Sequence, residues 1–174
     1  AEKNLKNFYL ILGITIYIFL LIAYVNGSYP YVGHDYRYFL SRLLDVKLHL
    51  RENGFSVQWF TPSFGGGIPA YFNPQHTQFS LAQLLSFFFD PWTAILISMG
   101  IFSAIGYFAC YQFGREIFGL KWQGATLSAL FFSTSGFYLQ RMAAGHFGYQ
   151  PFPLTVTILL LLFSQKFTFW IRGL

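Results

Sequence analysis

Long apolar runs separated by polar loops are the main pattern of this chain. The clearest run covers residues 8–25, FYLILGITIYIFLLIAYV, which carry no charge and reach across a bilayer at about 1.5 Å per residue. No small-residue cleavage site follows it, which favours a retained anchor over a cleaved signal peptide. Further runs predict spans at about residues 92–113, 125–139 and 153–165, and small residues in the 125–139 run suit close helix packing. The pattern therefore predicts about four transmembrane helices.

The long loop between the first two spans, residues 26–79, has a different pattern. Over residues 36–53 apolar side chains repeat on one flank of a helix and charged ones cover most of the rest. This predicts an amphipathic helix along the membrane surface. A second apolar piece, residues 79–89, is short for a span and is also expected at the interface. Between them lies FGGGIPAYFNPQH, residues 64–76, whose glycines and prolines disfavour helix and strand. The sequence thus predicts an all-α membrane protein with amphipathic interfacial helices in this loop.

Composition supports a membrane protein. Of the 174 residues, 55% are hydrophobic and only 10% are charged, whereas a soluble domain carries roughly a quarter charged residues. The net charge of +5 does not come from a basic run, so it gives no indication of nucleic-acid binding. The positive residues instead flank the apolar runs, where they meet membrane lipids at the headgroups.

The same positive residues indicate the orientation. Four spans place both termini on one side of the membrane, together with the short loop after residue 113. By the positive-inside rule this side is the cytoplasm, so residues 26–79 and 140–150 are expected on the outer face of the cytoplasmic membrane. The residues that set this orientation are Lys3, Lys6, Arg115, Lys121, Lys166 and Arg172.

The first acidic residue after the first span is Asp35, in the motif GHDYR. One interpretation is a helix N-terminal cap, because a carboxylate there accepts hydrogen bonds from free backbone N–H groups. The other is a general base, or a ligand for a divalent cation such as Mg²⁺ or Mn²⁺, that faces a lipid-borne substrate with His34 and Arg37 beside it. Spacing alone leaves both interpretations open.

Two further groups of polar residues fall on the same outer face. Arg141 and His146, in RMAAGH, suit a phosphate or pyrophosphate, since arginine offers a planar fork of donors. The alternative is an arginine that reaches up to lipid headgroups. Asn73, Gln75 and His76 offer uncharged donors and acceptors, which suit a hydroxyl-rich ligand or a structural turn. The preceding glycines lack the Lys-Ser/Thr of a phosphate loop, but they allow the backbone to approach a ligand or another segment closely.

Three motifs in this order carry a resemblance to a known family: GHD at residues 33–35, WFTPSFGGGIPAYFNPQ at 59–75 and SGFYLQRMAAGH at 135–146. Over roughly residues 8–165 the chain resembles the amino-terminal part of YfhO-like multi-spanning membrane proteins, which are related to the GT-C class of glycosyltransferases. The resemblance implies a polytopic fold. It also implies transfer of a sugar from a polyprenyl-phosphate carrier to an acceptor outside the cytoplasmic membrane.

The resemblance implies roles for individual residues as well. By position, Asp35 matches the functional carboxylate of the first outer loop, which would deprotonate an acceptor hydroxyl or help to hold a divalent cation. Arg141 and His146 would neutralise the departing lipid phosphate. Relatives of this class have many more spans, so the chain is expected to be the amino-terminal module of such an enzyme. The alternative is a non-catalytic membrane subunit, derived from such a protein, that packs against other subunits in a larger complex.

The predicted orientation can be tested by cysteine labelling in intact cells. Single cysteines at Ser56 and Gly148 are expected to react with a membrane-impermeant thiol reagent, because both positions lie in outer loops. A cysteine at Gly119, in the short cytoplasmic loop, is expected to stay unlabelled until the membrane is opened. The opposite pattern would reverse the orientation and remove the shared outer face of Asp35 and His146.

Overall fold

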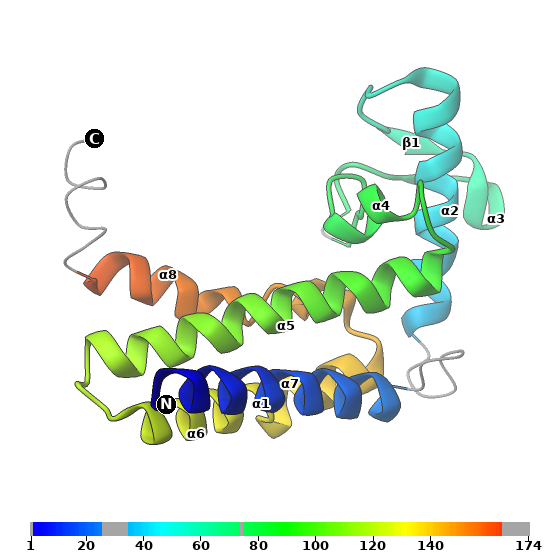
Figure 1. The fold of residues 1–174 in the computed structure, drawn as a ribbon. Helices are drawn as coiled ribbons and strands as arrows, with labels where there is room; N and C mark the ends of the chain where they lie inside the picture. Colours follow the sequence, from blue (N-terminus) through cyan, green and yellow to red (C-terminus); the bar gives the residue numbers. More distant parts are fainter. Residues whose placement is uncertain (1, 26–34, 74, 165–174) are drawn as a thin grey trace.

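The computed structural model describes residues 2–25, 35–73 and 75–164, and these residues are mostly helical (Figure 1). His34 and the interfacial tail expected after residue 165 lie outside the described residues. The helices are α1 (Glu2–Tyr24), α2 (Asp35–Asn53), α3 (Ser63–Gly66), α4 (Leu81–Leu85), α5 (Pro91–Glu116), α6 (Trp122–Ser133), α7 (Gly136–Ala144), the 3-10 turn η1 (Phe147–Tyr149) and α8 (Leu154–Phe163); two short strands are β1 (Phe60–Thr61) and β2 (Ile68–Pro69).

Two of the helices are long and apolar enough to cross a membrane. These segments are Asn4–Tyr24 of α1 and Pro91–Glu116 of α5. The 26 residues of α5 make a helix about 39 Å long, which exceeds a hydrocarbon core of about 30 Å. Large apolar side chains of α1, such as Phe8 and Phe19, are exposed, as suits contact with lipid.

The segment predicted as a span over residues 125–139 is not one helix. Helix α6 ends at Ser133 and α7 begins at Gly136, because Ser135 adopts ψ 131° and leaves the helical region. The Thr-Ser-Gly sequence at this point explains the break, since all three residue types are poor in helix interiors. The Thr134 hydroxyl donates back to the Leu130 carbonyl at 2.8 Å, as hydroxyl side chains often do at helix ends. The small residues that suggested close packing therefore also interrupt the helix that was predicted here.

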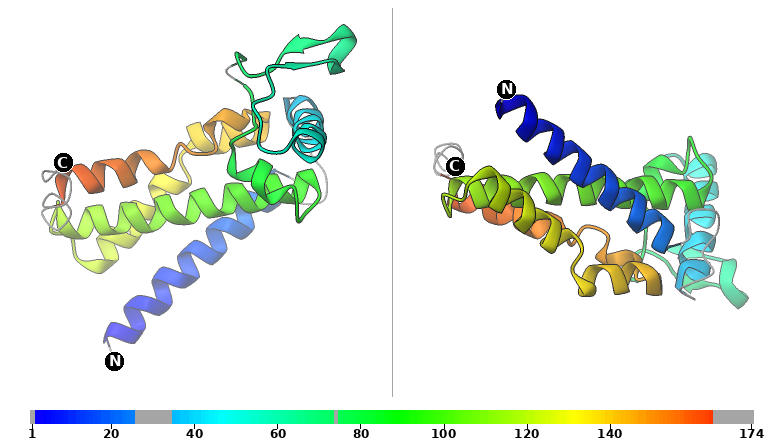
Figure 2. Two further views of the ribbon diagram at one scale, coloured as in Figure 1. Left: turned by 90° about the horizontal axis from the view of Figure 1, so that it is seen from above. Right: turned by 60° about the horizontal axis from the view of Figure 1, so that its bottom comes forward.

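Helix α5 is the centre of the fold, packing against α1, α4, α6 and α8. Figures 1 and 2 show α1, α6–α7 and α8 alongside α5, whereas α2 crosses the end where α5 begins. Glycines on α5 allow its neighbours to approach closely. A Cβ atom at Gly106 would lie 2.4 Å from Pro153 Cβ, and one at Gly114 would lie 3.4 Å from Ala125 Cβ.

Buried hydroxyl and amide groups connect these helices. The Tyr17 hydroxyl of α1 donates to Ser103 of α5 at 3.4 Å, and Ser103 lies 3.3 Å from the Tyr138 hydroxyl of α7. Near the start of α5, Ser98 donates to the side chain of Gln150 at 2.9 Å, and Gln150 donates to the Ile95 carbonyl at 3.2 Å. Each of these bonds has a defined geometry, so the set fixes which faces of the helices meet.

The irregular stretch after α2 forms a small hairpin with two short strands, although its glycines and prolines were expected to disfavour strand. Strand β1 pairs antiparallel with β2, and the connection between them runs through positive φ angles from Phe64 (63°) to Gly67 (100°). Of the three glycines, Gly67 is the one against which another segment packs. The ring of Phe60 would lie 2.2 Å from a Cβ atom there, whereas Gly65 and Gly66 have nothing within 4 Å.

The close packing of α5 and α8 can be tested with two glycines of one helix. We expect Gly106→Ala to destabilise the protein by about 1–3 kcal/mol, because the new methyl group overlaps Pro153. The control is Gly100→Ala, which meets nothing within 4 Å and is expected to stabilise the helix by about 0.5–1 kcal/mol. Thermal unfolding in detergent compares the two variants. Equal midpoints would show that α8 does not pack at Gly106.

Candidate functional site

A cleft of about 620 Å³ opens at the end of the bundle where α2 crosses α5. Segments far apart in the sequence form its walls: the start of α2, residues 75–81, the third and fourth turns of α5, and the segment from α7 to Pro151. Its polar lining includes the sequence-predicted residues Asp35, Gln75, His76, Arg141 and His146. Its apolar lining includes Phe39, Phe79, Leu81, Phe102, Phe147 and Pro151.

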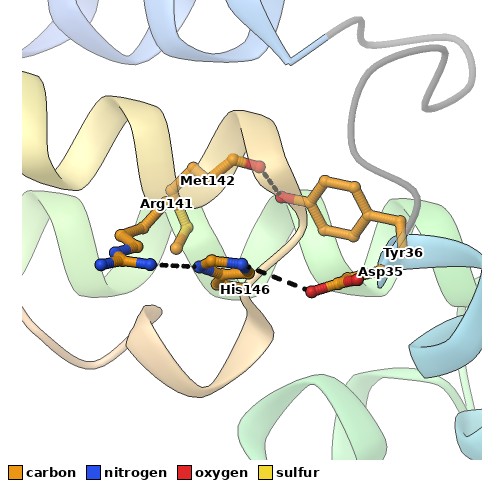
Figure 3. A network of polar contacts seen from close by, with 5 residues as sticks. All are labelled: Asp35, Tyr36, Arg141, Met142 and His146. Carbon is orange, nitrogen blue, oxygen red and sulfur yellow. Dashed lines mark hydrogen bonds and ion pairs between the residues drawn. The ribbon is translucent and has the colours of Figure 1, made fainter.

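Three of the polar residues lie in a row (Figure 3). His146 Nε2 lies 3.4 Å from the Asp35 carboxylate, and Arg141 Nη1 lies 2.9 Å from His146 Nδ1. A guanidinium group can only donate, so Nδ1 accepts and the proton of the neutral ring is on Nε2, facing Asp35. Arg141 thereby selects the tautomer of His146, and His146 orients the carboxylate.

The row is held by a close approach of two backbones. Gly145 adopts φ 86° where α7 ends, and the His146 N–H donates to the Arg141 carbonyl at 2.9 Å. A Cβ atom at Gly145 would lie 2.7 Å from the Tyr36 nitrogen and 3.2 Å from Asp35 Cβ. The glycine therefore satisfies a helix end and also allows the turn to touch α2.

Tyr36 anchors α2 at the same point. Its hydroxyl donates to the Met142 carbonyl at 2.5 Å (Figure 3), and its ring packs edge-to-face on Trp92 with centroids 4.9 Å apart. Burial raises the pKa of the Tyr36 hydroxyl, so it stays protonated and keeps donating. This buried bond ties the first turn of α2 to the end of α7.

Asp35 itself is half exposed and directed at the cleft. Its side chain is 52% exposed, against 33% for His146. Within the described residues the carboxylate contacts His146 and accepts no hydrogen bond from the first turn of α2. Of the two interpretations left open by the sequence, this geometry favours a carboxylate available to a ligand over a helix cap.

Arg141 is positioned by aromatic rings. Its guanidinium carbon lies 5.0 Å from the ring centroid of Tyr149 and 5.3 Å from that of Phe137. Such stacking leaves the in-plane N–H groups free to bind. Within the described residues the only hydrogen-bond partner of this guanidinium is His146, so its other donors can receive an oxyanion in the cleft.

The opposite wall carries neutral polar groups. His76 Nε2 lies 3.2 Å from Gln78 Oε1, and burial lowers the pKa of His76, so its ring is neutral near pH 7. The Gln75 backbone N–H donates to Asn73 Oδ1 at 2.9 Å. Asn73 therefore closes a turn, while Gln75 and His76 line the cleft.

Two other residues that the sequence predicted for the site are not among the described residues that line the cleft. Arg37 is exposed on α2 and does not line the cleft, and His34 lies outside the described residues. Two lining residues, Ser98 and Gln150, were missed from the sequence. The only signal for them is a polar residue beside an apolar run, and that signal does not distinguish a site from helix packing.

The described side chains offer few donors for a metal ion in the cleft. Within the described part of the chain, no group of three or more His, Cys, Asp or Glu side chains converges. The cleft provides Asp35, with His146 beside it. Mg²⁺ is commonly held by one or two carboxylates together with water and substrate phosphates. The Asp35 carboxylate fits that kind of ion, for which phosphate and water would supply the other ligands.

No known family model, curated protein or solved structure matches this chain. The resemblance to YfhO-like proteins stays an expectation drawn from three motifs.

The role of Gly145 in placing His146 can be tested directly. Gly145→Ala is expected to cost about 1–3 kcal/mol of stability, because alanine is strained at φ 86° and its methyl group overlaps Tyr36. The control, Gly148→Ala, lies three residues along in the same cleft wall and meets nothing within 4 Å. Unfolding in detergent should show a lower midpoint for the first variant alone. If the two variants behave alike, the turn is not held against α2.

Proposed function

We propose that this chain is the amino-terminal module of a membrane glycosyltransferase. It would move a sugar from a polyprenyl-phosphate carrier to an acceptor at the outer face of the cytoplasmic membrane. The observation that carries this proposal is one cleft in which a carboxylate and a guanidinium face the same space. The lining residues of the cleft include side chains from the start of α2 and from the long apolar helix α5, so a lipid-borne substrate could reach it from the membrane.

The donor half of the cleft suits a phosphate attached to an apolar chain. Arg141, which lies against the rings of Phe137 and Tyr149, offers free donors to phosphate oxygens. Nearby lining side chains such as Phe79, Leu81 and Phe102 offer apolar contact to an isoprenoid. A free nucleotide sugar would not use this apolar wall.

The row of residues in Figure 3 supports the following reaction. Asp35 takes the proton of the acceptor hydroxyl, and the acceptor oxygen forms a bond to the anomeric carbon of the sugar. The bond from that carbon to the phosphate oxygen breaks, and its electron pair stays on the lipid phosphate. Arg141 stabilises the charge that develops there. His146 holds the carboxylate in place, and Gln75 and His76 bind sugar hydroxyls.

The proposed membrane arrangement goes further than the two spanning helices. Helices α6 and α7 run one after the other alongside α5, and the apolar segment Phe147–Phe163 returns along it. We place these two segments in the bilayer as well, which gives four spans and both termini in the cytoplasm. The cleft then lies on the outer side.

A second candidate is the non-catalytic subunit. Helix α8 favours it, because its apolar side chains Ile158, Leu162 and Phe163 are all more than half exposed, which offers a face for another helix. Copurification of the intact protein at a fixed ratio with other membrane proteins, without transfer activity, would support this candidate.

The enzyme proposal is tested by Asp35→Asn. Asparagine keeps the size of the side chain but cannot act as a base, so transfer is expected to fall by about 10²–10⁴-fold. The assay follows sugar from a polyprenyl phosphate to acceptor in membranes that contain the full native protein. Expression and cysteine-labelling topology are checked in parallel.

The matched control is Asp90→Asn, the same chemical change outside the cleft. The Asp90 carboxylate accepts from the Trp92 and Thr93 N–H groups at 3.1 and 3.0 Å at the start of α5, and asparagine can replace it there. Its transfer rate is expected to stay near wild type. Normal transfer in Asp35→Asn would remove Asp35 from the mechanism, and no transfer in the wild type would favour the subunit.

A further inference from the structure

The hairpin after α2 has its polar side chains inside and its aromatic side chains outside. We define the aromatic hairpin as residues 55–73, which contain β1, α3 and β2. Within it, Gln58 and Thr61 are 3% and 2% exposed, whereas Phe55 and Phe72 are 90% and 76% exposed. This is the reverse of the distribution expected for a segment surrounded by water.

Three polar side chains of the hairpin donate hydrogen bonds to a single carboxylate. Asp45 of α2 accepts from Gln58 Nε2 at 2.8 Å, from the Thr61 hydroxyl at 2.8 Å and from the Ser63 hydroxyl at 2.7 Å. Gln78 adds two bonds, accepting from the Gln58 N–H and donating to the Ser56 carbonyl. The polar side chains are thus turned toward α2, which leaves the rings on the outside.

The exposed rings form a continuous aromatic surface without charge. Trp59 lies 5.2 Å from Tyr71 and 5.5 Å from Phe72 between ring centroids, and Phe60 is also exposed. No Asp, Glu, Lys or Arg occurs anywhere between Glu52 and Asp90. An uncharged aromatic surface of this kind marks contact with another protein or with a membrane.

The position of the hairpin indicates a membrane. Figures 1 and 2 place it to the side of the bundle, level with the end where α5 begins. If α1 and α5 cross the bilayer, that level is the interface between lipid and water. Trp and Tyr are enriched there because their rings are apolar and their N–H and O–H groups reach water.

We propose that the aromatic hairpin inserts into the interface of the outer leaflet and holds α2, with Asp35 at its start, against the membrane. The partner is the phospholipid surface itself. The absence of charge on the hairpin makes insertion independent of headgroup charge, unlike binding by a basic segment. The inference rests on α1 and α5 spanning the membrane and does not depend on sugar transfer.

The experiment uses the full native protein in phosphatidylcholine nanodiscs, with Cys110→Ser as background. Phe72→Cys carries a bimane probe, and the quenchers are a phospholipid with a doxyl group near its headgroup and iodide in the water. The control probe is at Glu52→Cys, a charged and exposed position at the end of α2. We expect doxyl lipid to quench the Phe72 probe and iodide to quench the Glu52 probe. Adding phosphatidylglycerol to the nanodiscs should not change how strongly the doxyl lipid quenches the fluorescence of the Phe72 probe.

A second probe at Phe55→Cys guards against a variant that fails to fold, because Phe55 is 90% exposed and its replacement removes little packing. Iodide quenching of both hairpin probes without doxyl quenching would place the hairpin in water. Protection from both quenchers would place another protein surface over it. Doxyl quenching that appears only when phosphatidylglycerol is present would show that the hairpin is attracted to anionic headgroups and does not insert independently of headgroup charge. Each of these three results overturns the proposal, whatever the transfer assay gives.

Discussion

The contact between the turn after α7 and the first turn of α2 is the one on which the end of the molecule around the cleft depends. It joins two backbones with no side chain between them, at Gly145 and Tyr36. The tyrosine hydroxyl then fastens the two elements through the Met142 carbonyl. Because Asp35 precedes Tyr36 and His146 follows Gly145, the same contact that closes the fold also assembles the cleft. Stability and site geometry are therefore linked at these positions.

The hairpin is held in a different way, by hydrogen bonds from its uncharged side chains to a single carboxylate. Asp45 comes from α2, yet its acceptor sites are filled by donors of the hairpin. The amphipathic character of α2 thus has two uses. Its apolar flank, with Phe39 and Leu43 buried, packs on the bundle, while Asp45 binds the hairpin.

The local sequence patterns predicted the positions of the helices more accurately than the contacts between them. Helix α2 occupies Asp35–Asn53, close to the predicted residues 36–53, because a clear apolar flank and a following glycine define it. The break before Gly136 was missed, since small residues suit both close packing and a helix end, and composition does not separate the two. The topology predicted from the sequence put Asp35, Arg141 and His146 on the same, outer face of the membrane. Their actual contact depends on the φ angle of Gly145, which no pattern of residue types encodes. The roles of Asn73 and Gln75, two residues apart, likewise differ only through the turn that forms between them.

The row of Asp35, His146 and Arg141 does not conduct protons from Asp35 toward Arg141. A guanidinium does not give up its proton at physiological pH and has no site to accept one. A proton that reaches Asp35 in the proposed reaction therefore cannot travel inward along the row, because His146 Nδ1 already faces a donor. Its way out is through the exposed half of the Asp35 carboxylate. The cleft would then be reset by water at its outer edge, and the protein interior behind Arg141 would take no part in removing the proton.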